Sequence, residues 1–238
     1  MTMIELNRIY NEDCLEGMKR IRDKSIDLVC TDIPYGEVNR ESNGLRKLDK
    51  GKADIFEMNL NELLAEIYRV TKGSIYIFCG TEQVSKIRKT LVNYGLSTRL
   101  IIWEKTNPSP MNGQHIWLSG VECCVYGKFK NATYNGHCNN TVLRYPCGKN
   151  KLHPTQKPLD LITKLILQSS NEGDLVLDPF MGSGTTAIAC INTNRNYIGF
   201  ELDKHYCDIA NERIRKALAD STRKDYDEMK VCVGKCNT

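Results

Sequence analysis

The sequence predicts an α/β protein built on a doubly wound, mostly parallel sheet. Short apolar runs alternate with stretches of helical periodicity along the 238-residue chain, and this alternation is typical of βαβ units. Several of the apolar runs are continuous, as in strands that helices cover on both faces. Because we find no internal repeat, we expect a single domain over residues 1–238.

The expected strands and helices follow one another in chain order. The strand-like runs are IELNRIYN, SIDLVCTD, GSIYIFCG, STRLIIWEK, VECCVYGKF, DLVLDPF and YIGFELD. The stretch LNELLAEIYRV has helical spacing, with apolar residues on one face: Leu60, Leu63, Leu64 and Ile67. The stretch PLDLITKLILQSS has the same spacing and apolar face: Leu159, Ile162, Leu165 and Ile166. Pro158 suits the first turn of that helix.

Three segments break this rhythm. Residues 36–58 are polar and basic, and residues 107–157 are rich in Asn, Gly and Pro. Connections of this length in a compact domain are usually functional or disordered. The last ~18 residues are polar, so we expect them to form a frayed tail.

Composition limits the class of protein. Hydrophobic residues make up 41% of the chain, and its net charge of +4 is compatible with a polyanionic partner. No apolar run approaches the ~18 residues of a membrane helix, and the N-terminus lacks the layout of a signal peptide. We therefore expect a soluble, cytoplasmic protein.

The eleven cysteines point to buried thiols more than to a metal. Most of them lie in apolar runs, where cysteine behaves as a small hydrophobic residue. There is no CxxC pair, and the remaining spacings match a zinc site poorly. We expect free thiols in a reducing compartment and no metal.

One chemical motif is the stretch DLVLDPFMGSGTTAIAC, which reads as a strand, an acid, a glycine-rich turn and a helix start. Gly182 and Gly184 allow a sharp turn and a close approach to a ligand. Thr185 and Thr186 are expected to cap the helix, whose free N–H groups favour an anion. No Lys-Ser/Thr follows the second glycine, so the turn is not a P-loop.

An acidic residue follows the glycine-rich turn at a sequence spacing that is informative about the ligand. Glu201 comes twenty-three residues after Asp178, at the end of the run YIGFELD. An acid at the tip of the next strand is placed to hold ribose hydroxyls. The turn and the acid together predict a nucleoside ligand with a small anionic tail.

The other chemical motif, CTDIPYG, delivers Asp32 from a buried strand into a turn with Pro34 and Tyr35. TDIPYG resembles the catalytic Asp-Pro-Pro-Tyr motif of DNA amino-methyltransferases. DPFMGSGTT resembles their S-adenosylmethionine-binding motif, and HPTQKP, residues 153–158, resembles the signature that precedes it in one permuted class. In this order the motifs are similar to those of the β class, the adenine-N6 and cytosine-N4 enzymes, and the resemblance spans residues 4–215.

The resemblance implies a catalytic role for Asp32, Pro34 and Tyr35. Asp32 and the carbonyl of residue 33 would accept hydrogen bonds from the target amine and stabilise its developing charge. Tyr35 would stack on the base once it leaves the duplex, and Pro34 would fix the turn. The family's first proline is Ile33 here, which keeps the carbonyl and is still pushed to extended angles by Pro34.

The resemblance also implies S-adenosylmethionine as cofactor, in a Rossmann-like methyltransferase fold with a small inserted recognition segment. The positions that match its contacts are Asp178, Phe180, Gly182, Gly184, Thr185, Glu201, Thr155, Lys157 and Asp13. Lys157 would pair with the methionine carboxylate. Asp13 would lie near the cofactor's adenine, or simply cap the helix CLEGMKRI.

The expected substrate is the N6 amine of adenine in double-stranded DNA, because family members with Asp first in the tetrapeptide are mostly adenine enzymes. Cytosine N4 is an alternative, as is a catalytically dead DNA-binding relative in which Ile33 has weakened the site. The order of motifs argues against RNA or protein-glutamine methyltransferases. The pair Pro146–Cys147 precedes the cofactor motif, which argues against a cytosine-C5 enzyme.

We expect residues 107–150 to be a target-recognition insertion and residues 36–58 to be a DNA-facing loop. A recognition segment this short suggests a short site or a homodimer that shares the duplex. The expected setting is the cytoplasm of a prokaryote, at the nucleoid, with a phage-borne origin also open. A restriction–modification role and an orphan role are both open.

Overall fold

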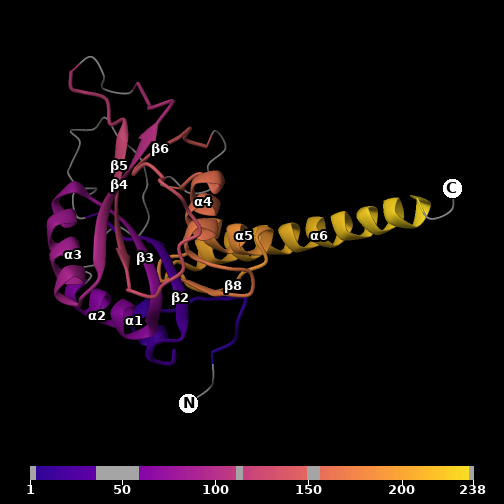
Figure 1. The fold of residues 1–238 in the computed structure, drawn as a ribbon, viewed down its shortest axis with the longest axis horizontal. Coiled ribbons are helices and arrows are strands. Elements are labelled where there is room, and N and C mark those ends of the chain that lie inside the picture. The colour runs from indigo at the N-terminus through magenta and orange to yellow at the C-terminus, as the bar shows by residue number, and fades with distance from the viewer. Residues whose placement is uncertain (1–3, 36–58, 111–114, 149–155, 236–238) are drawn as a thin grey trace.

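A computed structural model of the chain describes residues 4–35, 59–110, 115–148 and 156–235, with residues 221–235 described as backbone only (Figure 1). The described strands are β1 Arg8–Tyr10, β2 Ile26–Asp32, β3 Thr71–Cys79, β4 Ser97–Lys105, β5 Val121–Lys128, β6 Val142–Tyr145, β7 Leu175–Asp178 and β8 Asn196–Phe200. The described helices are α1 Cys14–Met18, α2 Leu60–Val70, α3 Thr81–Asn93, α4 Leu159–Ser169, α5 Thr185–Asn192 and α6 Lys204–Lys235.

The strands form one mostly parallel sheet in the order β1-β8-β7-β2-β3-β5-β4-β6. Only β5 among them runs antiparallel to its neighbours, β3 and β4. All seven predicted strands are present, which confirms the predicted fold class. Strand β6 lies in a segment expected to be a loop, and it pairs in parallel with β4 at the edge of the sheet.

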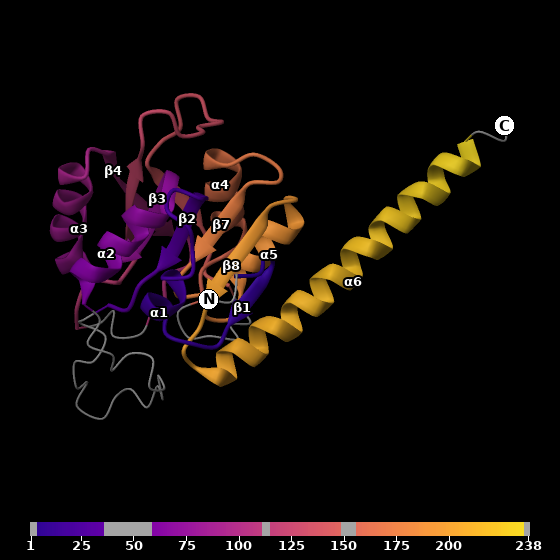
Figure 2. The same cartoon turned by 90° about the horizontal axis from the view of Figure 1, so that it is seen from below.

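Helices cover both faces of the sheet (Figures 1 and 2). One apolar cluster packs α1, α2 and α3 on one face, and a second cluster packs α4, α5 and α6 on the other. The sheet is therefore doubly wound, as the continuous apolar strands predicted.

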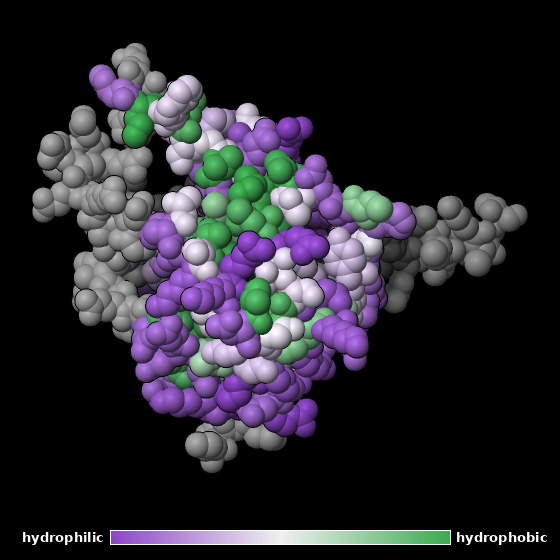
Figure 3. Space-filling model, turned by 60° about the vertical axis from the view of Figure 1, so that its left-hand side comes forward, coloured by the Kyte–Doolittle hydropathy of each residue, from purple (hydrophilic) through white to green (hydrophobic). Residues whose placement is uncertain are grey.

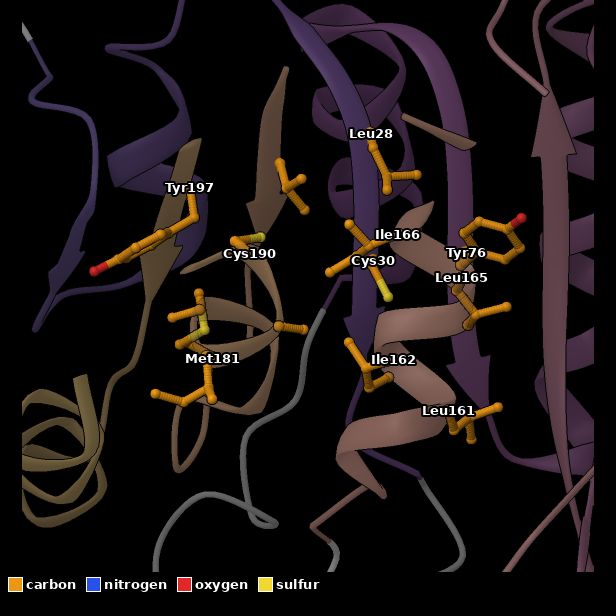
Figure 4. Packing of buried hydrophobic residues seen from close by; sticks show 14 of the residues in the cluster. Leu28, Cys30, Tyr76, Leu161, Ile162, Leu165, Ile166, Met181, Cys190 and Tyr197 are labelled. Carbon is orange, nitrogen blue, oxygen red and sulfur yellow. The ribbon is translucent and has the colours of Figure 1, made fainter. Parts of the chain in front are cut away.

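Helix α4 shows how the predicted periodicity becomes packing. Its buried apolar residues turn toward β2 and β3 in Figure 4: Leu161, Ile162, Leu165 and Ile166. Opposite them lie Leu28, Cys30 and Tyr76, and the Tyr76 hydroxyl is 2.7 Å from Ser169 Oγ. Each fully buried Leu or Ile contributes about 1.5–3 kcal/mol. Pro158 is the N-cap of the helix.

The expectation of a frayed C-terminal tail is wrong. Helix α6 continues to Lys235, and Figure 2 shows it projecting past the sheet. Polarity was a poor guide here, because the Lys, Arg and Glu residues of this segment are polar but favour the helix.

The order of strands creates a switch point between β2 and β7. These two strands pair in parallel, with Leu28 opposite Val176 and Val29 opposite Leu177. From β2 the chain winds outward to β3, whereas from β7 it winds the opposite way to β8. Ligands of such sheets bind at the carboxyl ends of the strands where the winding reverses. Asp32 and Asp178 end these two strands and so lie at that place.

Candidate active site

A cavity opens at the carboxyl ends of β2 and β7, and residues of both sequence motifs line it. The predicted residues on its wall are Asp13, Asp32, Pro34, Tyr35, Lys157, Asp178, Phe180, Gly182, Thr185 and Glu201. Gly184 is not among the lining residues, and Thr155 lies outside the described residues. The topology thus brings together segments that are about 140 residues apart in the chain.

The glycine-rich turn adopts the conformation that its glycines predict. Gly182 and Gly184 have φ angles of 54° and 85°, in the left-handed region that glycine enters at little cost. A Cβ on Gly184 would lie 3.0 Å from the Cβ of Ala210 on α6. Gly184 therefore serves the turn and the packing of α6.

The expectation that Thr185 and Thr186 cap the following helix is wrong. Gly184 itself is the N-cap of α5, and no side chain caps this end. Both threonines lie inside the helix and are buried. The Thr186 hydroxyl instead donates a 2.6 Å hydrogen bond to Asp178 Oδ2.

Asp178 is a buried acid at the floor of the cavity. Besides the Thr186 contact, it accepts a 3.1 Å hydrogen bond from the Phe180 backbone N–H. Burial raises its pKa to about 6, although these hydrogen bonds oppose the rise. Asp178 thereby ties the end of β7 to both sides of the glycine-rich turn.

Glu201, the predicted ribose acid, braces the same turn from β8. It accepts 2.8 Å hydrogen bonds from the backbone N–H groups of Gly182 and Asp203. Burial raises the pKa of its carboxyl group. Its carboxylate is therefore both part of the cavity wall and a support for the loop.

Asp13 has one of the two roles that its sequence context allows, because it is the N-cap of α1. Its carboxylate caps α1 by accepting hydrogen bonds of 2.9 Å from Leu15 N and 3.2 Å from Glu16 N. Its side chain also lines the cavity. A capping role and a place beside the cofactor are compatible.

The Asp-Ile-Pro-Tyr turn is braced from α3. Gln83 Nε2 donates to the Pro34 carbonyl at 3.1 Å, and Gln83 Oε1 accepts from Gly80 N at 2.9 Å. Ile33 is almost fully buried in the cluster under α2, and its N–H donates to the Phe78 carbonyl at 3.1 Å. Packing and Gln83 thus supply rigidity that a second proline would otherwise give.

Lys157 lies in an unexpected place. Its ammonium group contacts Asp32 Oδ2, lies 3.0 Å from Glu122 Oε2 and is 3.3 Å from the Tyr35 hydroxyl. The Tyr35 hydroxyl donates to Asp32 Oδ1 at 2.8 Å. The family resemblance implied a partner for the methionine carboxylate, whereas here the ammonium group joins carboxylates of β2 and β5.

These groups set one another's ionisation. Burial raises the pKa of Asp32, and the Lys157 charge opposes that rise. Burial also disfavours ionised Glu122, but Lys157 and Lys105 outweigh it and lower the pKa of Glu122. The burial of Lys157 would lower its pKa, yet the two carboxylates raise it. The charge of Lys157 therefore favours the carboxylate form of Glu122 and works against the effect of burial on Asp32.

Sequence reasoning missed Glu122, Gln83 and Arg213. Glu122 is the one acid in the apolar run VECCVYG, and a charge in a predicted buried strand is a signal that could have been used. Arg213, on α6, donates to the carbonyl and hydroxyl oxygens of Ser183 in the glycine-rich turn. Neither Arg213 nor Gln83 carries such a signal, because both are ordinary helix residues in sequence.

Three further observations concern the described residues only. They contain no cluster of three or more His, Cys, Asp or Glu side chains suited to hold a metal ion. Of the helices described, none has the length and apolar character needed to cross a bilayer. The described cysteines are all free.

Comparison with known proteins agrees with this geometry. The family described as DNA methylase matches residues 26–212. The chain is 31% identical to the Type II methyltransferase M.HpaI of Haemophilus parainfluenzae, over 96% of this chain and 79% of that protein. It is 29% identical to the DNA adenine methyltransferase YhdJ of Escherichia coli K12, over 88% of this chain and 83% of that protein.

A solved structure, a complex of M1.HpyAVI with SAM, superposes with a TM-score of 0.68 at 32% identity, covering 87% of this chain and 98% of that one. The fold and the site define an α/β methyltransferase. The chain belongs to the DNA methylase family, the amino-methyltransferases of the N6 and N4 type. It is a DNA methyltransferase that depends on S-adenosylmethionine.

Replacing Asp178 by Asn should change how stability depends on pH. The folded chain holds the Asp178 proton up to pH about 6, whereas an unfolded aspartate loses it near pH 4. The free energy of unfolding therefore falls as pH rises through this window, and Asn removes that fall. Between pH 5 and pH 8, D178N should gain on the order of 1 kcal/mol relative to wild type.

The measurement is urea unfolding of both proteins at pH 5, 6, 7 and 8. Asp174→Asn, which alters a half-buried acid directly before the same strand, is the matched control. A stability difference between D178N and wild type that stays constant with pH would contradict the raised pKa.

Proposed function

We propose that this enzyme transfers the methyl group to the N6 amine of adenine at specific sites in double-stranded DNA. The observation that carries the proposal is the placement of Asp32 on the wall of the cavity that the glycine-rich turn also lines. Tyr35 and Lys157 hold Asp32 in this position. The name of YhdJ, a DNA adenine methyltransferase, supports adenine as the base.

Asp32 is proposed to accept a hydrogen bond from the target amine. The amine lone pair is delocalised into the ring, so the site must favour the charge that develops on nitrogen as the new bond forms. A carboxylate beside the amine does so, and the backbone carbonyl of Ile33 is the second acceptor in this proposal. The Gln83 brace and buried Ile33 keep both acceptors in one arrangement, which is what preorganisation requires.

Lys157 is proposed to keep Asp32 ionised until the amine arrives. The base amine must take a place on Asp32 now filled by Lys157 or by the Tyr35 hydroxyl. Glu122 then retains Lys157 through its 3.0 Å contact. Tyr35, released from Asp32, presents its ring to the base for stacking.

The cavity fits S-adenosylmethionine by its own chemistry. When bound, this cofactor supplies an electrophilic methyl group on sulfur. The buried carboxylate of Glu201 suits ribose hydroxyls, and Phe180 offers an apolar wall for an adenine ring. Thr185 lies at the start of α5, where helix N–H groups favour a carboxylate. Asp13 and Asp178 complete the proposed contacts.

Cytosine N4 remains the alternative substrate, because the same two acceptors would serve either exocyclic amine. The alternative of a catalytically dead DNA-binding relative rested on Ile33 in place of a proline. Ile33 packs in the core and Gln83 holds the turn, which argues against a weakened site. We further propose that residues 107–150 recognise the target sequence and that residues 36–58, which lie outside the described residues, face DNA. The reaction would take place in the cytoplasm of a prokaryotic or phage-infected cell.

We also propose that the enzyme forms a homodimer through the outer face of β4, β5 and β6. Leu100, Val121 and Val142 are exposed there, and the strand register puts them on the same face as partly buried Ile102. Figure 3 shows apolar surface gathered in a patch, with hydrophilic surface below it. Clustered apolar surface of this kind favours a protein partner.

The test of the proposed reaction is product identification. Wild-type protein with labelled S-adenosylmethionine and unmethylated genomic DNA should give label in N6-methyladenine nucleoside. Asp32→Ala should lower the rate at least 100-fold, because it removes a transition-state acceptor, while cofactor binding by calorimetry stays within threefold. Label in N4-methylcytosine would overturn the base assignment, and no label from wild type would overturn the proposed function.

Replacing Lys157 by Met should move the pH dependence of the reaction. Without the ammonium group, Asp32 and Glu122 face each other, and one of two close carboxylates titrates at higher pH. The acidic limb of the kcat profile should shift upward by about one pH unit. Lys105→Met is the matched control, because Lys105 pairs only with Glu122 among these acids, and its shift should be smaller. An unchanged limb in K157M would contradict the role of Lys157.

If the protein is a homodimer, its mass measured by sedimentation should be twice the 27.1 kDa of the chain. Leu100→Glu should return the protein to the monomer mass, because a charge on the apolar face must be desolvated in the interface. Leu167→Glu, at an exposed site on α4, should leave the mass unchanged. A monomeric wild type at micromolar concentration would refute the proposal.

A further inference from the structure

The connection between β4 and β5 carries three consecutive exposed apolar side chains. Ile116, Trp117 and Leu118 expose 69%, 95% and 46% of their surface. A tryptophan is highly buried on average, and the other tryptophan of the chain, Trp103, is 1% exposed and donates through Nε1 to the Tyr145 carbonyl at 2.9 Å. We call residues 116–118 the apolar tip.

The apolar tip stands on a fixed base. Gly120 N donates to the Leu118 carbonyl at 2.8 Å, and Lys105 N donates to the Gly120 carbonyl at 2.8 Å. Lys105 Nζ reaches the Ser119 carbonyl at 3.4 Å. The tip is therefore held between the end of β4 and the start of β5, and Figure 1 shows this connection standing clear of the body above both strands.

A chain of contacts links the tip's base to the catalytic turn. Lys105, which touches Ser119, lies 2.9 Å from Glu122, and Glu122 lies 3.0 Å from Lys157. Lys157 in turn contacts Asp32. The tip thus rises from the same edge of the sheet as the acceptor of the target amine. The base must reach Asp32 at this same edge of the sheet.

The proposed reaction requires the target nucleotide to leave the base stack, and the apolar tip has side chains suited to this step. A target amine inside a duplex reaches Asp32 only if its nucleotide leaves the stack, which costs a few kcal/mol of unpairing and unstacking. Apolar side chains that enter between base steps offset part of that cost. An indole has a large flat face for bases, and its two aliphatic neighbours would lose exposed apolar surface in the same step.

We propose that Trp117, flanked by Ile116 and Leu118, stacks on the bases next to the extruded target nucleotide in duplex DNA. This inference rests on the proposed function, because it assumes that DNA reaches Asp32. It assigns to the tip a partner of one chemical kind, the exposed faces of stacked bases, and it makes Trp117 a residue that favours extrusion.

The first test uses the fluorescence of the two tryptophans. Trp103 is buried, so the emission that acrylamide quenches in the free protein should come from Trp117. Addition of unmethylated duplex genomic DNA with the cofactor product S-adenosylhomocysteine should quench that emission and protect it from acrylamide. Trp117→Phe identifies the signal by its loss. A Trp117 signal that stays fully accessible when DNA is bound would overturn the proposal.

The second test is kinetic. Trp117→Ala should lower kcat/KM on duplex genomic DNA about tenfold or more, the range for loss of one base–aromatic stack, and Trp117→Phe should restore most of it. The loss should be much smaller on heat-denatured DNA, where no stack must open. Leu167→Ala, exposed on α4, is the matched control and should match wild type.

The outcomes separate this inference from the proposed function. An inactive wild type would count against the proposed function itself. An active wild type with W117A equal to it on duplex DNA would overturn the role of the tip alone. A W117A protein that loses activity only through a change in sedimentation mass would assign the tip to self-association and would also overturn the inference.

Discussion

The arrangement of the site depends on one buried cation. Lys157 lies between Asp32 on β2 and Glu122 on β5. Without its positive charge, two carboxylates would lie close together in a poorly hydrated site. Removing one partner of a buried ion pair typically costs about 3–5 kcal/mol. The same contact fixes the direction of Asp32 and favours its ionised form, so the stability of this edge and the chemistry of the amine acceptor depend on one side chain.

The topology of the sheet then brings the catalytic turn and the glycine-rich turn to the same edge. Because the winding reverses between β2 and β7, the turn after Asp32 and the turn after Asp178 open into the same cavity. Hydrogen bonds of Asp178 and Glu201 with the glycine-rich turn shape the cofactor side. Gln83 shapes the substrate side. Asp178 and Glu201 are buried and Gln83 is half-buried, and their hydrogen bonds give a preorganised site.

Much of this was visible in the sequence. Continuous apolar runs predicted seven strands, and the left-handed angles of Gly182 and Gly184 follow from residue type. Other features were not visible. Strand β6 gains its place by pairing with β4. Helix α6 packs its first part against the sheet and continues beyond it to Lys235. Gly184 already occupies the cap position, so the two threonines after it lie buried inside the helix. The second of them, Thr186, donates a hydrogen bond to Asp178.

The sequence by itself determined the fold class, the two motifs and their order, because backbone conformation and apolar periodicity are local properties. Only the tertiary structure decided what Lys157 touches, that Glu122 belongs to the site, and that the connection carrying Trp117 rises from the same edge of the sheet. These are contacts between segments distant in the chain, and their free energies depend on burial and on neighbouring charge. Such quantities exist only once the sheet has assembled, since a side chain's surroundings are set by the strands that pack around it.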